Sequence, residues 1–284
     1  MNKIFKLIWN NALGQWIVCS ELGKKGKSSS KAVLLIGGVL VSSASLAVEC
    51  TQGTNGSVTV NNGNNTGANS NCEVSTILPE IGNTSIYNTG FLLYSQNANR
   101  SITLTNDLTT TLKGSSGISV YGTAPNFTSL FNAAGKKIDL TITNLDINSA
   151  NPSGDIIPKV GLGVSHGGTS TIGTLNLTML DLPKGTTLSD RFEHYGVVVG
   201  SSVNSGELNT FNGMKSKAIF DNLNIKMSAN NNPTFLNNYP LVVGIRAIQG
   251  APQSSGNGSA GYVEVNKDLK IDIKNLTNDA IGIY

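Results

Sequence analysis

Two histidines are the only side chains in this sequence that could provide the imidazole base of a hydrolytic triad. His166 lies in a turn-like Ser-His-Gly-Gly sequence, and His194 follows Asp190 and Glu193, whose carboxylates could orient it. A triad also needs an activated serine, and we identify none in a protease-type Gly-Asp-Ser-Gly context. We therefore predict that both histidines are exposed loop residues, that the protein is not an enzyme and that it uses no cofactor.

Metal-binding chemistry also has little support in the sequence. Cys50 and Cys72 are far from both histidines, so they give no ligand spacing of the kind that zinc sites use. The many Asn and Asp residues form neither an EF-hand loop nor a calcium-binding nonapeptide repeat. We expect no metal site.

The elements that must position these residues follow a long leader. Residues 31–47 have the pattern of an export signal: a basic flank, an apolar run over 32–40 and small residues ending at Ala47. The apolar run is shorter than the roughly 20 residues that a membrane-spanning helix needs. We predict cleavage between Ala47 and Val48.

Residues 1–30 precede this signal core and carry apolar residues at helical spacing, with lysines among them. An ordinary signal peptide needs no such extension. The residues that characterise it are Met1 to Phe5, Ile8 to Asn10, Trp16, Ser20 to Leu22, Gly26 and Lys27. With them, residues 1–47 resemble the extended signal peptide region of type V secretion proteins. The alternative is a long signal peptide with a chance amphipathic helix.

The resemblance implies that the leader engages the export machinery of the inner membrane. The rest of the chain would then pass through the periplasm to the cell surface and outer membrane, or be secreted. In that oxidising environment we expect Cys50 and Cys72 to form a disulfide, although two free thiols are the alternative. The third cysteine, Cys19, would leave with the leader.

The charge of the exported part argues against nucleic acid as a partner. The formal charge of the whole chain is +3, but six lysines and one glutamate lie in residues 1–47. The remaining 14 basic and 16 acidic residues give residues 48–284 a charge of about −2. We therefore expect no nucleic-acid binding.

From residue 77 onward the chain repeats one two-strand unit, called a phrase below. Its first strand alternates polar and apolar residues around a leucine that directly follows a polar residue. Its second, shorter strand has a glycine before a branched residue. The anchor leucines are Leu108, Leu145, Leu180, Leu223 and Leu269. The shorter strands occupy 90–93, 117–120, 161–164, 196–199, 244–247 and 282–284. No single phrase can bury its apolar residues without a neighbour above and below, so such a repeat is typical of a stack of coils.

We therefore predict an all-β fold: a right-handed parallel β-helix over 77–284, preceded by a helical or disordered leader and by a disulfide-tied cap over 48–76. The last phrase, 263–284, provides three short strands, about one turn of a three-sided coil. The extra length of the other repeats is assigned to insertions at 121–136, 149–159, 183–194, 200–216, 229–240 and 249–261.

This strand pattern resembles the passenger of a classical autotransporter, pertactin-like in architecture. The resemblance implies an adhesin-type surface protein with a host-cell or matrix ligand. The alternatives are an exported hydrolase of the same class and a two-partner-secreted haemagglutinin-like exoprotein. The candidate contact residues are the aromatic side chains of two predicted insertions, which alternatively cap the interior of the coil: Tyr121, Phe127, Phe131, Phe235 and Tyr239.

The family also implies a C-terminal transmembrane β-barrel, which this sequence does not contain. The sequence ends at Tyr284, within a repeat phrase. We therefore expect it to be the N-terminal piece of a longer protein or the product of a truncated gene.

Overall fold

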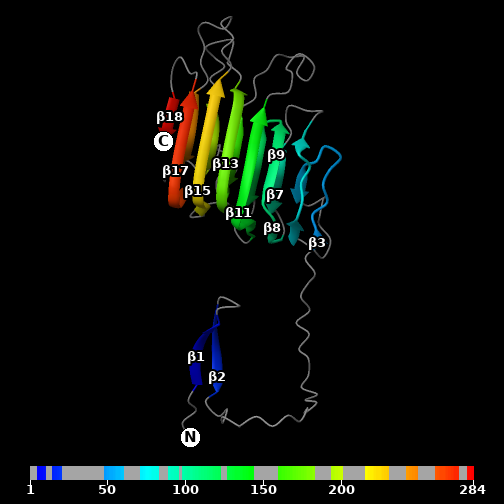
Figure 1. Cartoon of the computed structure of the whole chain (residues 1–284), viewed down its shortest axis with the longest axis vertical. Helices are drawn as coiled ribbons and strands as arrows, with labels where there is room; N and C mark the ends of the chain where they lie inside the picture. Colours follow the sequence, from blue (N-terminus) through cyan, green and yellow to red (C-terminus); the bar gives the residue numbers. More distant parts are fainter. Residues whose placement is uncertain are drawn as a thin grey trace, which may run out of the picture. The chain divides into compact units, whose positions relative to one another are not determined.

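A computed structural model gives the architecture of the protein (Figure 1). The structure describes residues 5–10, 15–20, 48–60, 71–82, 89–95, 98–122, 127–143, 159–182, 193–200, 215–229, 241–248, 260–274 and 280–284. The chain divides into two units, Met1–Ala44 and Ser45–Tyr284.

The described part of the first unit is a pair of antiparallel strands. They are β1 (Phe5–Asn10) and β2 (Gln15–Ser20), with Trp9 opposite Trp16. The prediction of a helix in residues 1–30 is therefore wrong for these segments. Both segments are rich in aromatic and β-branched residues, which favour extended backbone over helix. The signal core at 31–47 lies outside the described residues.

The described part of the second unit consists of strands and turns. Its first strands are β3 (Val48–Glu49), β4 (Val58–Val60), β5 (Asn71–Val74), β6 (Glu80–Ile81), β7 (Thr89–Ser95), β8 (Arg100–Leu104), β9 (Leu108–Lys113) and β10 (Ser116–Gly122). The later strands are β11 (Ser129–Thr143), β12 (Val160–Ser165), β13 (Thr169–Leu182), β14 (Glu193–Val199), β15 (Lys215–Ala229), β16 (Leu241–Ala247), β17 (Ala260–Lys274) and β18 (Ala280–Ile283).

These strands form two sheets in which every strand pair is parallel. One sheet has the order β18-β16-β14-β12-β10-β7-β4, and the other has the order β17-β15-β13-β11-β8-β5-β3. From β10 onward the strands of the chain alternate between the two sheets, and within each sheet they lie side by side in sequence order (Figure 1). β6 and β9 lie off these two orders and pair with each other, and β9 also pairs with β11. The strands of the predicted cap, β3, β4 and β5, join the same two sheets.

The longest strands each cover two sides of the coil. The first half of β11 pairs with β8, and its second half pairs with β9, so two separate short strands lie beside one long strand. The register shifts between Ala133 and Lys137, where Gly135 has a φ of 69°. With the glycine-started strands as the third side, this arrangement confirms the predicted parallel β-helix. Its right-handed sense stays a prediction, based on the usual hand of parallel crossovers.

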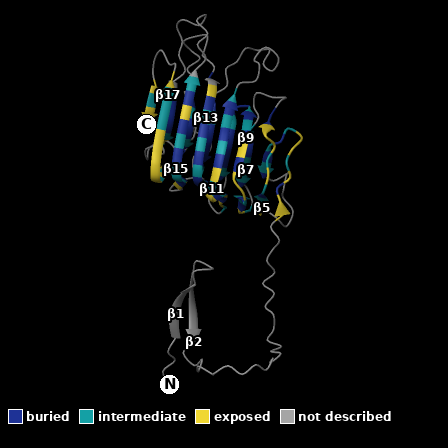
Figure 2. Cartoon of the chain, in the orientation of Figure 1, coloured by how far each residue is buried: buried dark blue, intermediate teal, exposed yellow. Residues whose placement is uncertain are grey.

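The core is one continuous column of apolar side chains inside the coil, and buried and less buried residues alternate along the long strands (Figure 2). One in-register row consists of Leu108, Ile138, Leu175, Leu223 and Leu269. The prediction of Leu180 as an anchor is therefore wrong, because Leu180 is 39% exposed. The prediction of Leu145 is untested, because Leu145 lies outside the described residues. Leu180 is an odd number of positions from Leu175, so it points to the opposite face of its strand.

The predicted shorter strands are confirmed as β7, β10, β12, β14, β16 and β18, and each begins one to three residues before its glycine. Their glycines form a ladder through the stack, consisting of Gly90, Gly117, Gly161, Gly196, Gly244 and Gly282. A Cβ atom on any of the first five would approach the carbonyl oxygen of the next glycine in the ladder. This close approach explains why glycine recurs at the equivalent position of each shorter strand.

The predicted insertion at 121–136 is largely wrong. Residues 121–122 complete β10, and β11 begins at Ser129, so most of the described part of this segment is strand. The other predicted insertions lie mostly outside the described residues. His194, assigned to the insertion at 183–194, belongs to β14.

Candidate functional site

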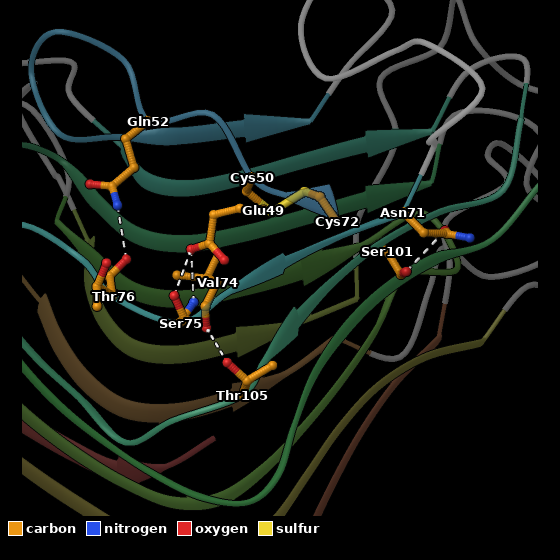
Figure 3. Close-up of a disulfide and its surroundings, with 10 residues drawn as sticks. All are labelled: Glu49, Cys50, Gln52, Asn71, Cys72, Val74, Ser75, Thr76, Ser101 and Thr105. Atoms are coloured by element: carbon orange, nitrogen blue, oxygen red, sulfur yellow. Dashed lines mark hydrogen bonds between the residues drawn. A yellow bond between two sulfur atoms is a disulfide. The ribbon is translucent and has the colours of Figure 1, made fainter. Parts of the chain in front are cut away.

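The disulfide at the start of the exported part has the predicted pairing. Cys50 and Cys72 are joined with a Cα–Cα distance of 4.9 Å, and each is 4% exposed. Figure 3 shows the bond beside β3 and β5, where Val48 pairs with Cys72. The bond therefore fixes the first strand after the predicted cleavage site to the first coil.

Side chains on both sides of the disulfide add to this attachment (Figure 3). Oε1 of Glu49 accepts hydrogen bonds from the backbone N–H of Ser75 at 2.9 Å and from its hydroxyl at 3.0 Å. Nε2 of Gln52 donates to the carbonyl oxygen of Thr76 at 2.8 Å. The sequence did not predict these contacts, because residues far apart in the chain make them.

His194 is a buried strand residue and not an exposed loop residue, so that prediction is wrong. It is 0% exposed, and its Nδ1 atom accepts a hydrogen bond from the backbone N–H of Lys159 at 3.0 Å. The atom that a triad carboxylate would contact is therefore already occupied by a backbone donor. Asp190 lies outside the described residues.

Lys159 is a buried titratable residue that lies next to His194, and the sequence did not indicate it. It is 5% exposed, and its Nζ donates to the carbonyl oxygen of Gly114 at 2.5 Å. Burial lowers the pKa of Lys159 to about 8, because the charged ammonium loses contact with water. Its position just before a strand of alternating apolar residues was the only signal in the sequence that could have indicated burial.

His166 lies in the turn between β12 and β13, as predicted, but it is half-buried. Its φ is 53°, the left-handed region that few non-glycine residues adopt. Ser165 and His166 form a hydrogen bond of 3.0 Å between Oγ and Nδ1.

Sequence reasoning missed that residues 163–167, Gly-Val-Ser-His-Gly, match the Gly-x-Ser-x-Gly pattern. The nucleophile elbow of that pattern places an exposed serine between a strand and a helix. Here Ser165 is 8% exposed, a strand follows the turn, and the positive φ belongs to His166. The local backbone does not have the elbow geometry.

Across the described ranges, the His, Cys, Asp and Glu side chains form no group of three or more that could hold a metal ion. It remains a prediction that the protein is not an enzyme and uses no cofactor.

The outer face of the long strands carries a ladder of polar side chains. Nδ2 of Asn176 donates to Oδ1 of Asp139 at 2.6 Å, and Nδ2 of Asn224 donates to Oδ1 of Asn176 at 2.8 Å. Burial raises the pKa of Asp139, but the hydrogen bond from Asn176 and the nearby Lys137 outweigh this effect, so the net pKa lies below its ordinary value. In the neighbouring column, Asn222 donates to Thr174 at 3.0 Å.

The predicted contact aromatics are not brought together as a group. Tyr121 is half-buried on β10, and Phe127 is half-buried just before β11. Phe131 is 0% exposed and packs edge-on against Phe91 at a ring distance of 5.5 Å, so it is a core residue and its assignment as a contact residue is wrong. Phe235 and Tyr239 lie outside the described residues.

Sequence reasoning also missed an aromatic-cation group near Tyr284. The guanidinium of Arg246 lies 5.6 Å from the ring centre of Tyr195 and 5.3 Å from that of Tyr284. Its Nη1 donates to the Tyr195 hydroxyl at 2.5 Å. The three residues belong to successive coils, so the group ties neighbouring coils together.

The comparisons with known proteins identify the leader. Residues 1–48 match the family model described as the Extended Signal Peptide of Type V secretion system. No curated protein and no solved structure matches the chain. In the part of the chain that the structure describes, no helix is long and apolar enough to cross a membrane.

The family match supports engagement of the export machinery and export across the inner membrane towards the cell surface or secretion. The Cys50–Cys72 bond and the parallel stack lie in the segment that follows the leader. Residues 1–48 are therefore an extended signal peptide of type V secretion, and they precede a parallel β-domain consistent with an autotransporter passenger.

Proposed function

We propose that this protein is an adhesin-type passenger that acts as an interaction protein at the cell surface. One observation carries the proposal: a type V leader stands directly ahead of a regular parallel β-helix. A stack of this kind is a rigid support whose connecting segments vary in length, and such segments are where binding residues concentrate.

The outer face of the stack supports a structural and binding role for the coil. The Asp139–Asn176–Asn224 ladder and the Thr174–Asn222 pair hold polar groups in register along the coil axis. Fixed side chains of this kind lose little conformational entropy on contact with a ligand, which favours affinity. Under this proposal the ligand is a molecule of the host-cell surface or of the extracellular matrix.

The test is binding of the exported protein to mammalian cells and to purified matrix proteins. The variant Phe235→Ala/Tyr239→Ala and the variant Phe127→Ala should each lower binding, because they remove aromatic anchors from the predicted contact segments. Leu180→Ala is the matched control, since Leu180 is an exposed apolar residue outside those segments.

Each variant is compared with the native protein by thermal unfolding, so that lost binding is separated from lost folding. Reduced binding with an unchanged unfolding temperature supports the proposal. If the native protein binds none of these surfaces, or if the contact variants bind as well as Leu180→Ala, the adhesin assignment is wrong.

A further inference from the structure

Gly163 lies in the middle of β12, on the outer face of the third side of the coil. Its two neighbours, Leu162 and Val164, are buried in the core, and side chains alternate between the two faces of a strand. The in-register partners of Gly163 are Ser119 on β10 and Val198 on β14. These three positions therefore form one row across the outer face.

Neither the backbone nor the packing requires glycine at position 163. The φ of Gly163 lies outside the left-handed region. In the described part of the chain, a Cβ there would meet only Cγ1 of Val160 at 3.5 Å and Cγ1 of Val198 at 3.9 Å, which are ordinary van der Waals distances. By contrast, a Cβ on Gly161 would lie 2.4 Å from the carbonyl oxygen of Gly196. A strand glycine that the fold does not need indicates a place where a ligand approaches the backbone closely.

Ser119 provides a polar group beside Gly163. Ile118 and Val120 on either side of it are buried in the core, so Ser119 faces outward, yet it is only 3% exposed. Its hydroxyl oxygen has no hydrogen-bond partner among the described residues and is not completely shielded from solvent. A polar group that is nearly buried without a partner costs free energy, which a ligand that hydrogen-bonds to it would recover.

Two tyrosines lie beside this row on the same outer face. Tyr94 on β7 and Tyr121 on β10 are in-register partners, and both are half-buried. Tyrosine offers a ligand both a flat apolar ring and a hydroxyl group. We call the whole group the Gly163 patch, and its members are Tyr94, Ser119, Tyr121, Val160, Gly163 and Val198.

The charge of the Gly163 patch limits the class of ligand. None of its six residues is charged. The next residue of the row is Arg246, whose guanidinium lies over the rings of Tyr195 and Tyr284. A surface without charge does not attract an anionic polymer, so the patch fits an uncharged ligand.

The size of the patch argues against a protein as the ligand. The patch covers four neighbouring strands, β7, β10, β12 and β14. At the usual strand dimensions it measures about 15 Å in each direction, or roughly 200 Å², whereas each partner in a standard protein interface contributes about 800 Å². A sugar is small enough, because its C–H face can pack on an aromatic ring while its hydroxyl groups bond to polar side chains.

We propose that the Gly163 patch binds an uncharged glycan, with one sugar ring on Tyr121 and over Gly163 and a sugar hydroxyl bonded to Ser119. The missing side chain at Gly163 lets the ring approach the backbone. This proposal rests on the adhesin-type function proposed above and names the class of ligand, a neutral glycan of the host surface.

The test is binding of the exported product to an array of uncharged oligosaccharides built from hexoses and N-acetylhexosamines, beside their sialylated and sulfated counterparts. We expect binding to members of the uncharged set. Isothermal titration calorimetry with the uncharged oligosaccharide that gives the strongest signal then measures the dissociation constant of each variant.

Three variants change the patch, and one variant is a control. Gly163→Ala and Tyr121→Ala should each raise the dissociation constant about tenfold, because a methyl group blocks the close approach or an aromatic anchor is lost. Ser119→Ala should raise it about threefold to tenfold, since one hydrogen bond is lost. Thr141→Ala, at an outward position of β11, should leave it unchanged. Thermal unfolding of each variant separates lost binding from lost folding.

The outcomes separate the glycan proposal from the adhesin-type function. If the native protein binds cells or matrix but no uncharged oligosaccharide, the glycan proposal is wrong and the adhesin-type function stands. If it binds uncharged oligosaccharides but neither cells nor matrix, the glycan site stands and the adhesin-type function is wrong.

Three further results would overturn the glycan proposal. The first is binding to sialylated or sulfated glycans alone. The second is equal affinity of the three patch variants and Thr141→Ala. The third is cell binding that falls in the patch variants but survives enzymatic removal of the cell-surface glycans, which would assign the patch to a protein ligand.

Discussion

A Cβ atom on Gly196 would lie 2.5 Å from the carbonyl oxygen of Gly244, the glycine at the same position of the next coil. It would also lie 2.9 Å from Cγ2 of Ile225, which packs from the facing side of the coil. The neighbouring glycines repeat this relationship along the stack. Glycine at this position therefore lets two sides of the coil come close enough to exclude water.

Gly196→Ala should lower the free energy of unfolding by about 1–3 kcal/mol, because the added methyl group forces backbone or Ile225 to move in a packed core. Gly282→Ala is the matched control, since a Cβ there meets nothing within 4 Å. Denaturant unfolding of both variants measures the difference. Equal stability of the two variants would contradict the ladder as a packing device.

Removing the disulfide should destabilise the exported domain. The bond closes a loop of 22 residues, and in the chain-entropy model a loop of that size contributes about 3 kcal/mol. The double variant Cys50→Ser/Cys72→Ser should lose about that much in denaturant unfolding. Cys19→Ser is the control, because Cys19 lies in the leader and should not affect the exported product. Unchanged stability of the double variant would show that the bond is dispensable.

Lys159 should make stability depend on pH in a specific direction. Its pKa is about 8 in the folded protein and has an ordinary value of 10.5, so the unfolded chain binds more protons between these values. The free energy of unfolding therefore rises as pH increases through that window. Below the window, the cost of burying the charged Lys159 is fully present. The total change is about 3 kcal/mol.

The variant Lys159→Met should lack this rise, which denaturant unfolding at several pH values between about 7 and 10 would detect. Lys217→Met, which removes an exposed lysine from β15, should keep the pH dependence of the native protein. If Lys159→Met and the native protein respond to pH in the same way, Lys159 is not buried as a cation.

Asn176 should contribute more to stability than its neighbours on the outer face. It donates to Asp139 and accepts from Asn224, so Asn176→Ala removes two side-chain hydrogen bonds at once. We expect a loss of about 1 kcal/mol in denaturant unfolding. Thr178→Ala, at the next outward position of β13, is the matched control. If Asn176→Ala lowers the free energy of unfolding no more than Thr178→Ala does, the hydrogen bonds of the ladder do not stabilise the fold.

The sequence predicted the parts of the fold that depend on local repetition. Glycine marked the third-side strands from β7 onward, because the close approach at Gly196 and its equivalents requires that residue. The register of the long strands was harder to predict. Leu175 and Leu180 look alike in sequence, and only stacking against Ile138 and Leu223 selects Leu175 for the core.

The burial of polar and aromatic residues could not be predicted from local sequence. His194 and Lys159 are far apart in the chain and become partners only because β12 and β14 are adjacent in the stack. Phe131 was assigned to a loop because its segment lies between two phrases, but pairing with β8 and β13 extends β11 over it. Such contacts depend on coil stacking and not on neighbouring residues.

The measurement that most directly tests the central claim is the N-terminal sequence and intact mass of the exported product. An exported passenger with a removable extended signal peptide should begin at Val48 and carry the Cys50–Cys72 disulfide, so its mass should be two hydrogens below that of the reduced chain. A product that keeps residues 1–47, or one that stays in the cytoplasm with free thiols, would contradict the account.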